Sequence, residues 1–215
     1  MVTNNIGSSN DRTIFAGDVV INGDLQPQSL LDRGNHPLES NRPFAIPWDA
    51  FRVHDAFGTS LPGTPLTDDL GLVGGTFGTG TPSIQTEDLK AAGATTSYAR
   101  FTFQLPAEYD DGQTVTLRVR AGMLTTIADM AATLDVEAYE SDGEAGVDAA
   151  DLVTTAAASI NSTTLADFDF VIDGSSLVAG DLLDIRLTVT VNDAATATAV
   201  KAILGSIEML VDIRG

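Results

Sequence analysis

The sequence predicts an all-β protein: an antiparallel two-sheet β-sandwich of the jelly-roll type, preceded by an extended, Pro/Gly-rich N-terminal arm. Two observations lead to this fold class. All eight prolines and the only tryptophan of the 215-residue chain lie within residues 1–106. The later residues alternate between apolar and polar side chains with a period of two, which is typical of half-buried antiparallel strands. We therefore expect an arm over residues 1–97 and a sandwich over residues 98–215.

The arm is expected to contain only short strands. Residues 13–25 predict one strand that closes at the turn pair Asn22-Gly23. Residues 26–47 hold four prolines, which remove backbone donors and exclude a central strand. A second short strand is expected over residues 48–57. Residues 58–97, with eight glycines, predict a long loop that packs on a neighbouring subunit, with one helical turn over residues 87–92 capped by Thr86.

The sandwich is predicted from segments with clear alternation, at residues 98–105, 115–120, 134–139, 168–172, 183–191 and 207–214, and from a weaker strand near residues 152–160. Connections such as Asp173-Gly174 carry turn residues. Several short strands joined by such turns indicate a two-sheet sandwich. A jelly roll is favoured over an immunoglobulin-like sandwich because the strand starts are widely spaced and no Cys…Trp…Cys pattern exists.

The charge distribution limits the classes of partner. The formal net charge is −19, and 19 acidic but only 5 basic residues follow residue 106, compared with 11 and 6 before it. Such a surface repels nucleic acid and anionic lipid, because phosphate binding relies on Lys and Arg. The start of the chain has no signal-peptide pattern, and no apolar stretch approaches ~18 residues. We expect a soluble protein made in a cytoplasm, with neither nucleic acid nor membrane as a partner.

Signatures of catalysis are weak. The glycine-rich residues 71–80 lack the lysine of a phosphate-binding loop, and no nucleophile elbow is present. His36 and His54 lie 18 residues apart, and with Asp55 they do not complete a zinc site. We expect no enzyme, no catalytic residues and no cofactor. A pair of carboxylates that cleaves glycosides stays open as an alternative, because 30 acidic residues allow many geometries.

Oxygen ligands for calcium cluster in one turn-rich segment, at Asp142, Glu144, Asp148 and Asp151. Calcium takes about 6–8 oxygen ligands, and the spacing fits no EF-hand. The chain has no cysteine, which removes thiolate metal sites. The segment is expected to be a solvated acidic loop, with these four residues as weak calcium candidates and no other metal site.

Large apolar side chains of the arm are the expected assembly contacts. Aromatic residues are enriched at protein interfaces, because they bury much apolar area at low conformational cost. The predicted interface residues are Phe15, Val19, Ile21, Trp48, Phe51, Phe57 and Phe77.

Several segments resemble structural proteins of tailed-phage virions. Residues 16–25, AGDVVINGDL, are similar to short strands of phage fibre and head-attachment proteins, and residues 103–109, 114–120, 133–142 and 179–191 resemble phage structural proteins with a jelly-roll body. The resemblance implies a capsid decoration, head spike or fibre-type subunit. Such a subunit would form a homotrimer, contact the capsid or a connector, and reside in the virion after synthesis in the host cytoplasm.

Two functions follow as hypotheses. The first is a non-enzymatic structural protein of a phage-like virion that assembles through its N-terminal arm. The second is a carbohydrate-binding or adhesive β-sandwich module, assisted by calcium if the acidic loop binds the ion. The second predicts exposed aromatic side chains, since these stack on sugar rings.

Overall fold

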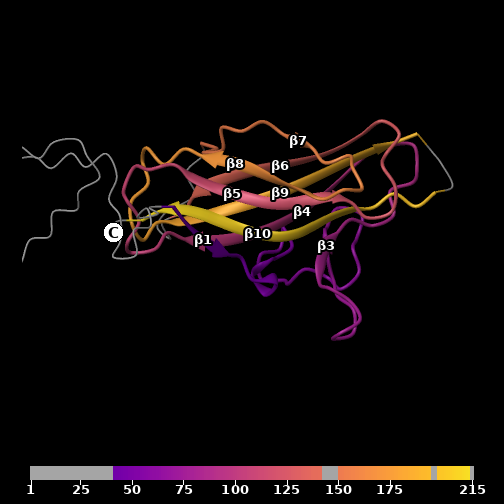
Figure 1. Ribbon diagram of the computed structural model, residues 1–215, viewed down its shortest axis with the longest axis horizontal. Coiled ribbons are helices and arrows are strands. Elements are labelled where there is room, and N and C mark those ends of the chain that lie inside the picture. Colours follow the sequence, from indigo (N-terminus) through magenta and orange to yellow (C-terminus); the bar gives the residue numbers. More distant parts are fainter. Residues whose placement is uncertain (1–40, 142–149, 195–197, 214–215) are drawn as a thin grey trace, which may run out of the picture. The chain divides into compact units, whose positions relative to one another are not determined.

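The structure, a computed structural model, describes residues 41–141, 150–194 and 198–213 (Figure 1). The chain divides into two compact units, Met1–Leu38 and Glu39–Gly215, and all described residues belong to the second. The predicted strand over residues 13–25 and the predicted interface residues Phe15, Val19 and Ile21 lie outside the described residues.

The described residues form β-strands joined by loops and one short 3-10 turn, and none of their helices is long and apolar enough to cross a membrane. The strands are β1 (Asn41–Ala45), β2 (Gly71–Val73), β3 (Ser83–Gln85), β4 (Gly93–Gln104), β5 (Val115–Met123), β6 (Ala131–Glu140), β7 (Ala158–Ser159), β8 (Ala166–Ile172), β9 (Leu182–Asp193) and β10 (Ala202–Asp212). The 3-10 turn η1 covers Trp48–Ala50.

The strand order is that of a jelly roll. One sheet has the order β2-β3-β10-β5-β8, the other β4-β9-β6-β7, and all paired strands are antiparallel. From β3 to β10, every connection crosses from one sheet to the other except that between β6 and β7, which are neighbours. Figure 1 shows the long strands stretched along the horizontal axis. This double-sheet arrangement of the eight strands β3 to β10 confirms the predicted all-β jelly roll.

Strand β10 is paired along one edge by two separate short strands. Its start, at Ile203 and Leu204, pairs with β3, and its end, over residues 208–212, pairs with β1. Pro43 of β1 lies opposite Leu210. This is an edge position, where a missing backbone donor is tolerated. Together β1 and β3 fill one strand position, although 37 residues of chain, 46–82, separate them.

The sandwich therefore does not begin at residue 98, and the compact unit starts at Glu39. Between the two sheets, the inward side chains of β4, β5, β6, β8, β9 and β10 form the core, as the alternation predicts. Residues before 98 complete it: the buried side chains from this segment include Ile46, Phe51, Leu61, Leu70, Ile84 and Leu89. The long glycine-rich loop of the sequence prediction is thus largely a covering layer of the same body.

Three local predictions differ from the structure. Residues 48–57 form η1 and then only single-residue bridges at Arg52, rather than a strand. Residues 87–92 form no helical turn. Instead, Leu89 N donates to Val200 O (2.8 Å), and Thr86 Oγ1 accepts a bond from Ala202 N (3.0 Å). Of the weak strand at 152–160, only β7 is regular. At residues 86–89, the bonds with Val200 and with Ala202 of β10 take the place of those that a single helical turn would supply.

Candidate binding face of the sandwich

The central outward positions of the sheet formed by β4, β9 and β6 carry polar and tyrosine side chains, and small or apolar residues (Ala94, Ala131, Leu182) occupy outward positions only at the strand ends. The antiparallel register places these side chains in rows across the three strands. We call this surface the polar face. It comprises Thr96, Tyr98, Arg100, Thr102, Asp184, Arg186, Thr188, Thr190, Thr133, Asp135, Glu137 and Tyr139.

Two arginines lie side by side at the centre of the polar face. Arg100 is directly opposite Arg186 in the register, a placement of like charges that is destabilising by itself. Each guanidinium has its own carboxylate: Arg100 Nε donates to Asp184 Oδ1 (2.6 Å), and Arg186 Nε donates to Glu137 Oε2 (2.7 Å). A second nitrogen of each arginine bonds the same carboxylate. The pairs neutralise the centre of the face and fix the guanidinium planes.

The guanidinium groups of both arginines pack over aromatic rings. Arg186 Cζ lies 5.3 Å from the centroid of the Tyr98 ring, and Arg100 Cζ lies 5.0 Å from that of Phe57. Tyr98 also stacks on His54, with 4.4 Å between ring centroids. Cations over aromatic faces are attracted by the ring quadrupole. The result is an alternating series of rings and charges rather than a set of isolated ion pairs.

Tyr139 adds a second phenol to the polar face. Its hydroxyl donates to Glu137 Oε1 (3.3 Å). Burial raises the pKa of Tyr139 above its ordinary value, and the charges of Glu137 and Asp151 act in the same direction. At the far end of the face, the hydroxyls of Thr96 and Thr190 lie 3.0 Å apart across the strands. The face thus offers hydroxyl, guanidinium and carboxylate groups beside aromatic surface.

An edge segment, residues 51–60, borders the polar face along the free side of β4. Arg52 and Arg100 exchange two backbone bonds, of 2.8 and 3.0 Å. Phe51 anchors the segment because its ring is buried and lies 5.0 Å from that of Phe101. A few residues further along β4, Leu70 N donates to Tyr98 O (2.9 Å). The border of the face is therefore attached to the core.

The predicted interface aromatics are separated by the fold. Phe51 belongs to the core, and Trp48 packs partly buried against it. Phe57 is 41% exposed beneath Arg100, and Phe77 is 100% exposed in the loop between β2 and β3. Sequence analysis missed Tyr98, Tyr139 and the arginines as a group. The alternation of β4, β6 and β9 contained that signal, because it assigns them all to outward positions.

The calcium candidates are mostly beyond the described residues, which exclude Asp142, Glu144 and Asp148. Asp151 is described, and its Oδ1 accepts bonds from the backbone nitrogens of Ala138 and Val153, each 3.0 Å long. This carboxylate therefore ties the segment before β7 to the edge of β6.

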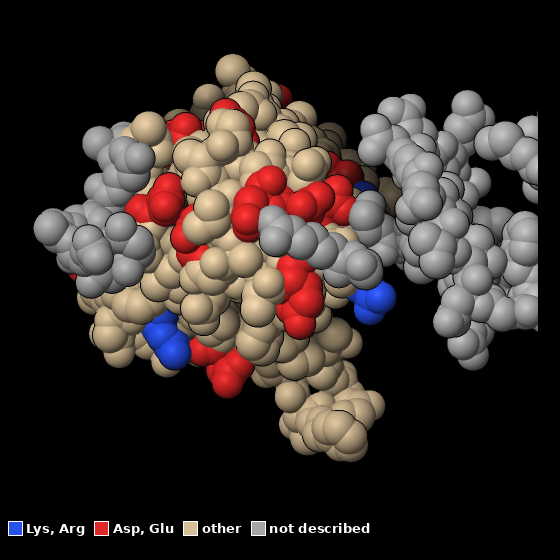
Figure 2. All heavy atoms as spheres, turned by 90° about the vertical axis from the view of Figure 1, so that its left-hand side faces the viewer, with Lys and Arg blue, Asp and Glu red and all other residues tan. Residues whose placement is uncertain are grey.

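Acidic side chains gather at one end of the body, seen end-on in Figure 2. Near the end of β10, the acidic residues Asp110, Asp111, Asp181 and Asp212 surround Tyr109. Tyr109 is fully buried, and its hydroxyl donates to Gln113 O. Burial, followed by these four charges, raises the pKa of Tyr109 to about 12. The acidic end repels anions and keeps the buried phenol protonated.

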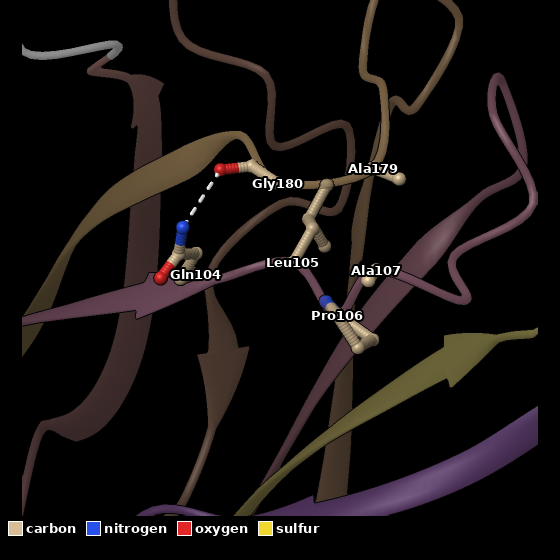
Figure 3. A pocket seen from close by; sticks show the side chains of 6 residues that line it. All are labelled: Gln104, Leu105, Pro106, Ala107, Ala179 and Gly180. Atoms are coloured by element: carbon tan, nitrogen blue, oxygen red, sulfur yellow. Dashed lines mark hydrogen bonds between the residues drawn. The ribbon is translucent and has the colours of Figure 1, made fainter.

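A hollow at the start of the loop after β4 has a volume of about 480 Å³ (Figure 3). It is lined by Gln104, Leu105, Pro106, Ala107, Ala179 and Gly180. The only polar side chain of this lining is Gln104, and its Nε2 already donates to Gly180 O (3.2 Å). The lining offers no nucleophile, acid or base, so this hollow gives no support for catalysis.

Comparisons with known proteins assign no family. The sequence matches no protein-family model and no curated protein at a significant level. The similar solved structures include the CBM22-2 xylan-binding domain of Paenibacillus barcinonensis Xyn10C, at 10% identity and a TM-score of 0.43, over 78% of this chain and 98% of that one. They also include the CBM22-1–GH10 modules of Clostridium thermocellum xylanase 10B complexed with xylohexaose, at 12% identity and a TM-score of 0.41, over 81% of this chain and 28% of that one.

A phage protein is also among the similar structures. It is the enzymatically active domain of tailspike protein 4 of bacteriophage CBA120, at 15% identity and a TM-score of 0.39, over 67% of this chain and 18% of that one. Identities and TM-scores at this level establish neither a shared function nor a shared family. The fold assignment rests on the strand order of this chain.

Proposed function

We propose that the protein is a non-enzymatic carbohydrate-binding module whose binding surface is the polar face. One observation carries this proposal: two arginine–carboxylate pairs are interleaved with the half-buried phenols Tyr98 and Tyr139 on one open sheet surface. Sugars present hydroxyl groups that both donate and accept hydrogen bonds, and apolar C–H faces that pack on aromatic rings. Guanidinium donors, carboxylate acceptors and phenol rings match both features.

A glycan array probed with the full-length protein tests this proposal. We expect retention on at least one class of neutral polysaccharide, and loss of that retention in the double variant R186A/Y139A. Arg118→Ala is the matched control, because Arg118 bonds Asp169 across strands on the opposite sheet but lies outside the polar face. No retention by the wild-type protein, or equal loss in R118A, would contradict the proposal. Repeating the array with a chelator shows whether a metal assists.

A second function, a subunit of a phage-like virion, is favoured by Phe77. This ring is 100% exposed in a loop, and aromatic residues are enriched at protein–protein interfaces. As the occupant of this contact we propose a second copy of the chain, within a homotrimeric decoration, spike or fibre subunit. Residues 1–38 would serve as the arm that attaches it to capsid or connector proteins.

The native mass of the full-length protein tests this second function. Sedimentation at micromolar concentration should give three times the 22.4 kDa of one chain, and Phe77→Ser should shift the mass toward the monomer. Phe57→Ser is the control, since Phe57 packs beneath Arg100 of its own chain. A wild-type monomer would count against the subunit role and leave the glycan proposal standing.

A further inference from the structure

Three side chains that can coordinate a metal ion, from two separate parts of the chain, meet beside the polar face. His54 and Asp55 come from the edge segment, and Asp69 comes from the stretch that precedes β2. Arg52 pairs with Arg100 and Asp69 pairs with Tyr98 along the same free edge of β4. This pairing brings one nitrogen of His54 and one carboxylate oxygen of each aspartate within 4.8 Å of one another.

Two atoms of this group are buried without a hydrogen-bond partner. They are His54 Nδ1 and Asp69 Oδ1, which lie 3.6 Å apart, too far for a good hydrogen bond. Asp69 is only 9% exposed, so its carboxylate is largely removed from water. Buried polar atoms that lack a partner are uncommon and costly. Both atoms belong to groups that bind metals.

We propose that His54, Asp55 and Asp69 form a binding site for a divalent first-row metal ion of the zinc type. Zinc accepts imidazole nitrogen and carboxylate oxygen at about 2.0–2.2 Å, so two tetrahedral ligands lie roughly 3.3 Å apart. The 3.6 Å between His54 Nδ1 and Asp69 Oδ1 needs only a small adjustment to reach this separation. Asp55 is exposed and gives the ion access from solvent, where water completes the coordination.

Zinc fits this ligand set better than calcium does. Calcium takes about 6–8 oxygen ligands, whereas imidazole favours zinc and its neighbours in the first row. The site also differs from the acidic loop that the sequence suggested for calcium, since none of Asp142, Glu144, Asp148 and Asp151 takes part. The missing element in sequence analysis was Asp69, which lies 15 residues after His54 and approaches it only through the pairing with β4.

The ion would fasten the edge segment to the stretch before β2. It would do so next to Tyr98, whose ring stacks on His54. A ligand that binds only the folded state stabilises it in proportion to the logarithm of its concentration over Kd. The inference is independent of glycan binding, because the site does not require a sugar.

Calorimetric titration of the EDTA-treated, dialysed full-length protein with zinc chloride tests the site. We expect one equivalent bound and a rise in melting temperature, with binding weakened more than about tenfold in H54Q, D69N and D55N, as loss of a direct ligand should cost at least as much as loss of an outer-shell partner. D167N is the matched control, because Asp167 is an exposed acid on the opposite sheet. Absence of zinc binding to the wild-type protein, or unchanged affinity in H54Q, overturns the proposal.

A spectroscopic test avoids any dependence on the folding of the ligand variants. The chain has two histidines, so H36Q retains His54 as its sole imidazole. In an NMR spectrum of H36Q, one equivalent of zinc should shift the ring signals of His54, while calcium at the same concentration leaves them unchanged. Ring signals that do not respond to zinc overturn the proposal, as does loss of zinc binding in H36Q.

Discussion

The two outer sheet surfaces of the sandwich both carry arginine–carboxylate ion pairs, but these pairs differ in their exposure to solvent. On the sheet that contains β5 and β8, Arg118 bonds Asp169 and Arg120 bonds Asp167, and these side chains are 37–51% exposed. On the polar face, by contrast, Asp184 is 10% exposed and the Phe57 ring packs against its partner Arg100. Exposed pairs contribute little to stability, whereas enclosed ones must be complete to be tolerated.

The difference comes from the edge segment. This segment brings the Phe57 ring onto Arg100 and the His54 ring onto Tyr98 of the polar face. On the β5–β8 surface, the cross-strand arginine–aspartate pairs of the described residues form a solvated ladder. Solubility is the simplest role of that ladder, and ligand recognition is the role we assign to the polar face.

Removing residues 1–97 should have the largest effect on this contrast. The deletion takes away the edge segment, strands β1 to β3, and six large buried side chains. Each buried side chain contributes about 1.5–3 kcal/mol, so the loss of roughly 9–18 kcal/mol is as large as the ~5–15 kcal/mol stability of a typical domain. We expect no cooperative melting by circular dichroism. Deleting only residues 1–38 is the control and should preserve the transition; a stable protein beginning at Tyr98 would show instead that the sandwich is autonomous.

Breaking one ion pair on each surface should give a smaller but asymmetric effect. Asp184→Asn leaves the part-buried Arg100 without its carboxylate and is expected to cost about 1–2 kcal/mol in the free energy of unfolding. Asp169→Asn removes the same type of partner from the exposed Arg118 and should cost about 0–1 kcal/mol. Urea unfolding at neutral pH measures both values. Equal losses would mean that the edge segment does not shield the Arg100–Asp184 pair from solvent.

The smallest expected effect is on the pH dependence of stability. The exposed surface should lose stability at acidic pH, and the polar face should lose it at alkaline pH. On the exposed surface, the hydrogen bond from Arg118 lowers the pKa of Asp169 below its ordinary 3.8. Its stabilisation is therefore present above pH 3.8 and is lost as the pH falls through the folded-state pKa. On the polar face, the raised pKa of Tyr139 gives stability that is present below the ordinary pKa of 10.0 and is lost as the pH rises through the folded-state pKa.

Two variants separate these contributions. Relative to D169N, the wild-type protein should lose its advantage in urea as the pH falls below about 4. Relative to Y139F, it should lose stability only above about pH 10. If the stability difference from the wild-type protein changed over the same pH range for D169N and for Y139F, the assignment of these groups to different environments would be wrong.

Sequence analysis recovered the strands that are long enough for their own residues to alternate between apolar and polar side chains. The alternation in residues 98–105, 115–120, 134–139, 168–172, 183–191 and 207–214 falls on β4, β5, β6, β8, β9 and β10. It missed β1, β2 and β3, because a five-residue strand with Pro43 and two three-residue strands have too few positions to show a period of two. Their assignment depends on pairing with β10 or, for β2, with β3, which local propensity does not contain.

The candidate sites show the same limit. The polar face follows from alternation once β4, β9 and β6 are known to be neighbours. The proximity of His54 and Asp69 does not, since it depends on an irregular path held by the bridges to β4. The expected boundary at residue 97 was set by composition, whereas the compact unit begins at Glu39 because apolar side chains before residue 98 fill the core.

The divided edge of β10 has a consequence for self-association. A long, regular strand at the margin of a sheet offers unpaired backbone groups on which other chains can assemble into fibrils. Here that margin is made of β1, which is five residues long and carries Pro43, and of the three-residue β2 beside β3. Neither offers an uninterrupted template. At this margin of the sheet, the short and interrupted strands disfavour amyloid-like stacking without relying on negative charge.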